Sequence, residues 1–220
     1  MNVGDYVWTR SEGIYWIAKI LEDSKYIRNN EKYVNYDIGF CRKVEYSKAG
    51  FHESEVPGKI ISSFSARNST QNVEDQSGRL YKYTDSLFTG EKKLKIRLED
   101  WIIFFSANDI EEIIGLYLQV EKKLYIYTST NKKSTAKIEF ELIDSEGNLY
   151  GVQVKTGHVS LNGDDYSEIS EKMKIFLFAT SDKVNIGNNK NLIHIKVEEI
   201  TKFIEQNKKL LPERISRWLK

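Results

Sequence analysis

The chain has 220 residues, 40% hydrophobic and 30% charged, which is long enough for one large or two small domains with buried cores. Lys and Arg number 33 against 32 Asp and Glu, and this balance excludes a strongly basic nucleic-acid coat and an acidic tail. The single cysteine excludes an internal disulfide, and no hydrophobic run approaches the roughly 20 residues of a membrane-spanning helix. We therefore expect a cytoplasmic protein without a membrane partner.

Residues 1–64 are expected to form a small β-barrel domain. Hydrophobic and aromatic residues gather in short runs at 6–8, 14–21 and 33–40, and glycines separate the runs. Short strands at this spacing with glycine turns are typical of barrels and strongly bent sheets. Residues 65–98 are more polar and are interpreted as a linker with some structure of its own.

Residues 99–220 are expected to form a second domain that mixes helices and strands. Asn108 is predicted to cap a helix with Glu111 as its capping-box partner, because hydrophobic residues then recur at helical spacing. Strands are predicted at 124–130, 138–143, 149–155, 174–180 and 192–197, and helices at 164–173 and around 200–204. The order αβββαβ predicts an α+β or α/β fold with a mixed sheet.

The strongest chemical pattern lies in the predicted hairpin of 138–143 and 149–155. Alternate residues of a strand share a face, so Gln153 lies on one face with Lys155, and Glu139 with Glu141. The hairpin can bring these faces together, and carboxylate and amide oxygens are ligands that Mg²⁺ accepts. A lysine beside such a site can balance phosphate charge. The alternative is an ordinary solvated strand face.

This pattern resembles the PD-(D/E)XK nuclease superfamily, in which a helix precedes a hairpin with an acid on one arm and (D/E/Q)-x-K on the other. Gln153-Val154-Lys155 is similar to the QxK variant of Mrr-type restriction nucleases, and Gln153 follows Glu139 by 14 residues. The run Ile110-Glu111-Glu112-Ile113-Ile114 also resembles that family's leading helix. The resemblance covers residues 108 to about 180.

The resemblance implies a role for each site residue. Glu139 and Gln153 would hold Mg²⁺, or Mn²⁺ in its place, and Lys155 would orient the attacking water. Glu111 would bind a second metal or order its waters. Glu111 borders the hydrophobic stripe of its helix, whereas Glu112 lies nearly opposite it.

Two departures from the family pattern leave alternatives open. The first acid is Glu where the family usually has Asp, so Glu141 and Asp144 remain alternatives to Glu139. Gln153 brings no charge to the metal, which also leaves room for an inactive descendant.

The first domain resembles the opening of SH3-like barrels of the PWWP and Tudor kind. Gly4-Asp5-Tyr6-Val7-Trp8 and the run from Gly13 to Ile20 carry this resemblance. Such barrels often bind a modified ligand in an aromatic cage. The candidates for that cage, or for nucleic-acid contact, are Trp8, Tyr15, Trp16 and Tyr36. The alternative is that these side chains belong to the core of a small barrel.

The resemblances imply a metal-dependent DNA endonuclease in restriction or antiviral defence, with DNA as partner and a homodimer for double-strand cleavage. One alternative is a catalytically inactive module that binds nucleic acid or protein on a nuclease fold. Another is a DNA-repair or junction nuclease, which the same core chemistry would serve.

Overall fold

The computed structural model describes residues 1–27, 39–64, 70–91, 97–127 and 137–219. The chain divides into two compact units, Met1–Lys95 and Ile96–Lys220. The elements of the first unit are β1 (Tyr6–Ser11), β2 (Ile14–Ile20), β3 (Lys25–Tyr26), β4 (Phe40–Cys41), β5 (Val44–Tyr46), η1 (Glu53–Glu55), α2 (Gly58–Ser63) and α3 (Arg79–Thr89).

The first unit is built on an antiparallel sheet in the order β1-β2-β5. A tight turn at Glu12 and Gly13, both with positive φ, joins β1 to β2 and suits the twist of a hairpin. Strands β3 and β4 are two residues long and pair with each other rather than extending this sheet. The expected barrel is therefore not confirmed: the described part of this unit contains no closed barrel.

Helix α3 lies inside the segment that was expected to be a linker. Its hydrophobic face is buried, and its polar side chains reach the sheet: Trp8 Nε1 donates to Thr84 Oγ1 (3.2 Å), and the Tyr6 hydroxyl donates to Asp85. Gly78 and Gly90 flank the helix with the positive φ that glycine adopts without strain. This segment therefore contributes to the core of the first unit.

Within the described ranges, the second unit contains most of the helices and the larger sheet. Its elements are η2 (Leu98–Asp100), α4 (Trp101–Phe104), α5 (Ala107–Lys122), β6 (Tyr125–Ile126), β7 (Phe140–Ile143), β8 (Leu149–Lys155), β9 (Leu161–Asn162), η4 (Gly163–Tyr166), α6 (Ser167–Ser170), β10 (Lys174–Ala179), β11 (Val184–Asn185), β12 (Leu192–His194), α7 (Val197–Gln206), η5 (Lys208–Leu210), α8 (Glu213–Ser216) and η6 (Arg217–Leu219).

The five-stranded sheet has the order β12-β10-β8-β7-β6. Strands β8, β10 and β12 run parallel, whereas β6, β7 and β8 are antiparallel neighbours, so the sheet is mixed as predicted. Strand β10 is buried from Ile175 to Ala179, as a continuous hydrophobic strand between two neighbours should be. The mixed α+β class is confirmed, and from α5 the chain order is α5-β6-β7-β8-β9-α6-β10, in which the two-residue strand β9 is added to the predicted order αβββαβ.

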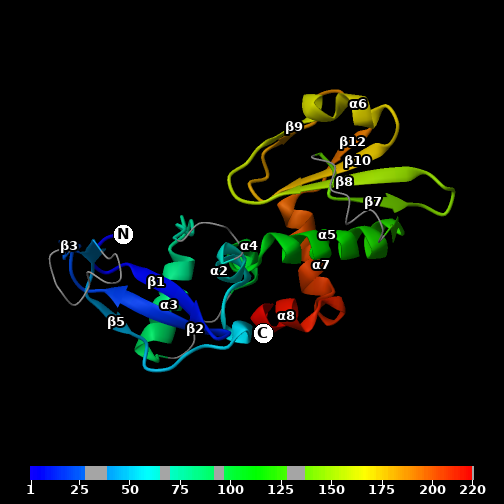
Figure 1. The fold of residues 1–220 in the computed structure, drawn as a ribbon. Helices are drawn as coiled ribbons and strands as arrows, with labels where there is room; N and C mark the ends of the chain where they lie inside the picture. Colours follow the sequence, from blue (N-terminus) through cyan, green and yellow to red (C-terminus); the bar gives the residue numbers. More distant parts are fainter. Residues whose placement is uncertain (28–38, 65–69, 92–96, 128–136, 220) are drawn as a thin grey trace. The chain divides into compact units, whose positions relative to one another are not determined.

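Helices and short elements cover both faces of this sheet (Figure 1). Helix α5 packs on one face, where Gly115 lies close to Ile126 and Phe140, and α7 packs beside it through a hydrogen bond from Tyr117 to Glu199 (2.9 Å). On the other face lies a core cluster of Ile138, Leu161, Tyr166, Ile175, Leu177, Ala179 and Leu192.

Two helix predictions are wrong in detail. The cap of α5 is Ser106 rather than Asn108: Ser106 Oγ accepts from the Asp109 N–H (3.1 Å), and Asp109 accepts in return from the Ser106 N–H (3.0 Å). This reciprocal capping box starts the helix earlier and leaves Asn108 exposed inside it. The helix predicted at 164–173 is reduced to η4 and α6, because the chain turns towards β10 after Ser170.

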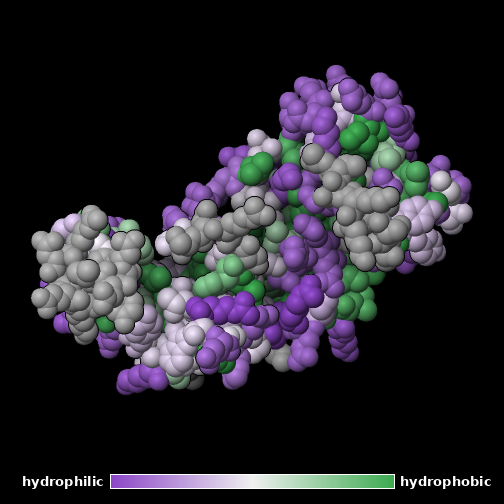
Figure 2. Space-filling view, in the orientation of Figure 1, coloured by the Kyte–Doolittle hydropathy of each residue, from purple (hydrophilic) through white to green (hydrophobic). Residues whose placement is uncertain are grey.

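No helix in the described ranges is long and apolar enough to cross a membrane. The face of the molecule in Figure 2 is mostly hydrophilic, and hydrophobic residues show on it in separate small groups.

Candidate functional site

A carboxylate, an amide and an ammonium group meet at one end of β8. Glu139 Oε1 accepts a hydrogen bond from Gln153 Nε2 (2.7 Å) and lies 3.6 Å from Lys155 Nζ. The predicted meeting of these three side chains is therefore present in the structure.

The hairpin register explains this meeting. Phe140 pairs with Val152, and the N–H of Glu139 donates to the Val152 carbonyl oxygen (2.8 Å) just before β7 begins. The chain bends at Glu139, which places its side chain beside Gln153. Lys155 follows two residues later on the same strand face.

The three side chains differ in their access to solvent. Gln153 is 1% exposed, whereas the side chains of Glu139 and Lys155 are 26% and 39% exposed. A substrate can therefore reach the acid and the lysine directly. The amide lies beneath them, where its second hydrogen bond goes to the Val154 carbonyl oxygen (3.2 Å).

Glu111 on α5 shares the electrostatic environment of this group. Burial raises the pKa of its carboxyl, the negative charge of Glu139 raises it further, and the positive charge of Lys155 lowers it. The charges of Glu139 and Lys155 therefore both act on the carboxyl of Glu111.

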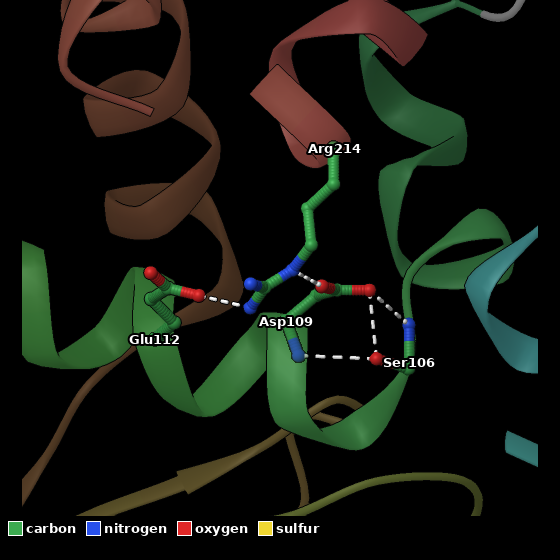
Figure 3. Close-up of polar contacts among 4 residues, drawn as sticks. All are labelled: Ser106, Asp109, Glu112 and Arg214. Carbon is green, nitrogen blue, oxygen red and sulfur yellow. Dashed lines mark hydrogen bonds and ion pairs between the residues drawn. The ribbon is translucent and has the colours of Figure 1, made fainter. Parts of the chain in front are cut away.

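The neighbouring Glu112 faces elsewhere, as the helical spacing predicted. Arg214 on α8 forms ion pairs with Glu112 and with Asp109 (2.8 Å for Asp109), and Figure 3 shows its guanidinium reaching both acids on α5. Glu111, rather than Glu112, is therefore the acid that this helix presents to the site.

Tyr166 also belongs to the surroundings of the site and was not singled out for chemistry in the sequence. It is 5% exposed, and its pKa is raised by burial and by the negative charges of Asp165 and Glu139. In the sequence Tyr166 was predicted only as a residue on the hydrophobic face of a helix. That pattern does not predict that Tyr166 lies close to Glu139.

The two alternative acids lie further along the hairpin. Glu141 pairs with Gly151, which lies two residues before Gln153 on β8. Asp144 lies in the hairpin turn, where its carboxylate accepts from the N–H groups of Glu146 and Asn148, the Asn148 side chain and the Tyr150 hydroxyl. These hydrogen bonds lower the Asp144 pKa to about 2. Asp144 therefore stabilises the turn.

The donor set suits a lightly coordinated Mg²⁺. Across the described ranges, no group of three or more His, Cys, Asp or Glu side chains could hold a metal ion. The site instead offers two carboxylates and one amide. Mg²⁺ often takes one or two carboxylates and completes its shell with water and substrate phosphate, so the residues fit this ion.

The structure divides the described aromatic candidates of the first unit between the two faces of the sheet β1-β2-β5. Tyr15 is 0% exposed and belongs to the core, and Trp8 lies on the same sheet face, half-buried under α3. Trp16 is the strand partner of Thr9, and its side chain lies on the opposite face of the sheet, where it packs against Gly50. Tyr36 lies outside the described residues. Trp8 and Trp16 cannot line one cage because they lie on opposite faces of the sheet.

No family model and no curated protein matches the chain. A solved structure described as an EndoMS complex with double-stranded DNA is similar at a TM-score of 0.26 and 10% sequence identity. The match covers 92% of this chain and 61% of that one, so this chain spans about three-fifths of the other protein's length.

Proposed function

We propose that the second unit is a metal-dependent DNA endonuclease that hydrolyses phosphodiester bonds. The observation that carries this proposal is the contact of Glu139 with both Gln153 and Lys155, beside the coupled carboxyl of Glu111. Its support from the sequence is the resemblance to PD-(D/E)XK nucleases, which requires an acid, an amide or acid, and a lysine at one place.

Glu139 and Glu111 are the charged groups that would hold Mg²⁺ or Mn²⁺, and Gln153 would add a neutral oxygen. When bound, such an ion supplies Lewis-acid stabilisation of phosphate charge. Gln153 now turns its NH₂ group toward Glu139. It must rotate its amide to offer the oxygen, so we expect the site to bind a metal weakly before DNA arrives.

Lys155 supplies the positive charge that faces the substrate. Its ammonium group pairs with Glu139 at 3.6 Å and remains 39% exposed. A phosphate that approaches the site gives this group a second acceptor. The ammonium can then orient an attacking water and stabilise the charge that develops in the transition state.

The biological role that we propose is restriction or antiviral defence, with two chains acting as a homodimer on the two DNA strands. The test is incubation of plasmid and phage DNA, modified and unmodified, with Mg²⁺, Mn²⁺ or EDTA. We expect cleavage with either metal and none in EDTA. Loss of cleavage in Lys155→Ala, with folding retained, assigns the activity to this site. A Lys155→Ala variant that cleaves at the wild-type rate would overturn the proposal.

A second candidate function is a nucleic-acid-binding module that retains the fold without the reaction. The neutral amide at position 153 favours it, because one charge that would attract a metal is missing. DNA binding that is unchanged by EDTA, without cleavage under any metal, would establish this alternative.

A further inference from the structure

We infer that the substrate backbone runs along the edge of the sheet at which β8, β10 and β12 end, where Lys183 and Lys196 bind phosphates beside Lys155. We call this the carboxyl edge. The inference rests on the proposed function and adds to it the path of the DNA across the site.

Topology places a lysine after each of the three parallel strands. Lys155 ends β8, Lys183 follows β10 in the turn to β11, and Lys196 follows β12. Parallel neighbours end at the same edge, and the register confirms that Ala179 lies beside Lys155 and His194 beside Leu177. Neighbouring strands are about 4.8 Å apart, so the edge spans roughly 10 Å, the rise of about three base pairs.

Hydrogen bonds join the three strand ends. The Thr180 N–H donates to the Lys155 carbonyl oxygen (3.0 Å), which holds the turn after β10 against the catalytic end of β8. In the same turn, Asp182 Oδ1 accepts from the Val197 N–H (3.3 Å) and lies 3.2 Å from His194 Nε2. Lys183 and Lys196 are the chain neighbours of Asp182 and Val197, so these contacts keep the two lysines close.

The charge at this edge is available to a ligand. Lys183 and Lys196 are both exposed. The acidic side chains near them already have partners within the unit. Asp182 contacts His194 and the Val197 N–H, Glu198 pairs with Lys202 (3.0 Å), and Glu199 accepts from the Tyr117 hydroxyl.

The opposite edge of the same sheet provides a matched control. Lys172 lies two residues before β10, and Lys174 is the first residue of that strand. Both are exposed, and they lie beside Asn148 and Tyr150 at the hairpin end. Replacing either pair by Gln changes the net charge equally. The two double variants therefore differ only in which edge loses its positive charge.

The experiment measures binding of a fluorescein-labelled 20-base-pair duplex by anisotropy in EDTA, between 50 and 200 mM KCl. The logarithm of the binding constant falls as the logarithm of the salt concentration rises, and each lost phosphate contact makes this slope less steep by about 0.9. We expect Lys183→Gln/Lys196→Gln to bind more weakly, with a slope smaller by roughly 1.8, and Lys172→Gln/Lys174→Gln to match wild type.

Equal losses in the two double variants, or an unchanged slope in Lys183→Gln/Lys196→Gln, would overturn the inference. Cleavage by the wild-type chain is measured in parallel with Mg²⁺. If the wild-type chain cleaves DNA and the salt slope of Lys183→Gln/Lys196→Gln is unchanged, only the proposed DNA path is wrong. A wild-type chain that neither binds nor cleaves DNA defeats the proposed function and the path together.

Discussion

One oxygen of Glu139 accepts a hydrogen bond from the Gln153 amide and forms an ion pair with the Lys155 ammonium. These two contacts compensate the charge of a carboxylate that is three-quarters buried. Glu111, which is coupled to the same charges, has its pKa raised mainly by burial. A positive ion that enters the site therefore competes with Lys155 for Glu139 and relieves the repulsion between the two acids.

A first prediction concerns Gln153. Gln153→Glu adds a charge at a proposed ligand position with little change of shape, and we expect it to tighten Mn²⁺ binding about tenfold, because affinity follows ligand charge. Calorimetric titration with Mn²⁺ in the absence of DNA measures this. Gln206→Glu, which adds the same charge at an exposed position of α7, is the control. Micromolar binding by wild type, or weaker binding by Gln153→Glu, would show that Gln153 is not a ligand.

A second prediction concerns the hairpin turn. The Asp144 pKa is lowered from 3.8 to about 2 by hydrogen bonds to its ionised form. Its stabilising contribution is therefore complete above pH 3.8 and is lost as the pH falls through about 2. We expect Asp144→Asn to be less stable than wild type at pH 7, with the difference vanishing near pH 2.

Denaturant unfolding between pH 2 and pH 7 checks the Asp144 prediction. Glu146→Gln is the control, because it removes the same charge from the same turn while only the Glu146 backbone N–H contacts Asp144. A difference between Asp144→Asn and wild type that is constant with pH would contradict the assignment of the lowered pKa to these hydrogen bonds.

At the scale of the elements, helix α5 is held at its first turn. Ser106 and Asp109 cap each other, and Arg214 from α8 pairs with Asp109 and Glu112 (Figure 3). The hydrophobic stripe that follows fixes the rotation of the helix against the sheet. These contacts decide where Glu111 lies relative to Glu139.

A third prediction separates the two possible caps of α5. Ser106→Ala removes the acceptor for the Asp109 N–H, and we expect the free energy of unfolding to fall by about 1 kcal/mol. Asn108→Ala changes an exposed position within the helix and should alter it by less than about 0.5 kcal/mol. Urea unfolding of the two variants measures both values. The reverse order would show that the helix begins at Asn108.

At the scale of the whole molecule, each unit has a core of its own. All four proposed site residues lie in Ile96–Lys220, whereas the aromatic candidates lie in Met1–Lys95. The candidates within the first unit are not equivalent, because Tyr15 is fully buried and Trp16 is partly exposed.

A fourth prediction follows from this division. Residues 96–220 expressed alone should fold and cleave DNA with Mg²⁺, because the proposed chemistry uses no residue of the first unit. Circular dichroism establishes folding, and plasmid cleavage measures activity against that of the full chain. A folded fragment without activity, beside an active full chain, would show that the first unit contributes to the reaction.

A fifth prediction concerns the first unit. Tyr15→Ala should lower its stability by about 3–5 kcal/mol, the usual cost of removing a buried aromatic side chain. Trp16→Ala, at a half-buried position, should cost less. Thermal unfolding of the two variants checks this order, and similar losses would show that Trp16 is also a core residue.

The sequence by itself determined the features that depend on local pattern. The hydrophobic run of β10 and the hydrophobic stripe of α5 predicted both elements, because burial of such residues dominates their folding. The meeting of Glu139, Gln153 and Lys155 was also predictable, because a hairpin joins residues only 14 positions apart.

The tertiary structure alone decided the features that depend on distant contacts. Tyr166 enters the site region because η4 packs on the far face of the sheet, and α3 joins the core of the first unit through Trp8 and Tyr6. Lys183 and Lys196 share the carboxyl edge with Lys155 because three strands separated in the chain pair in parallel. Local sequence patterns do not predict such pairings, because each pairing depends on which surfaces bury one another when the whole chain folds.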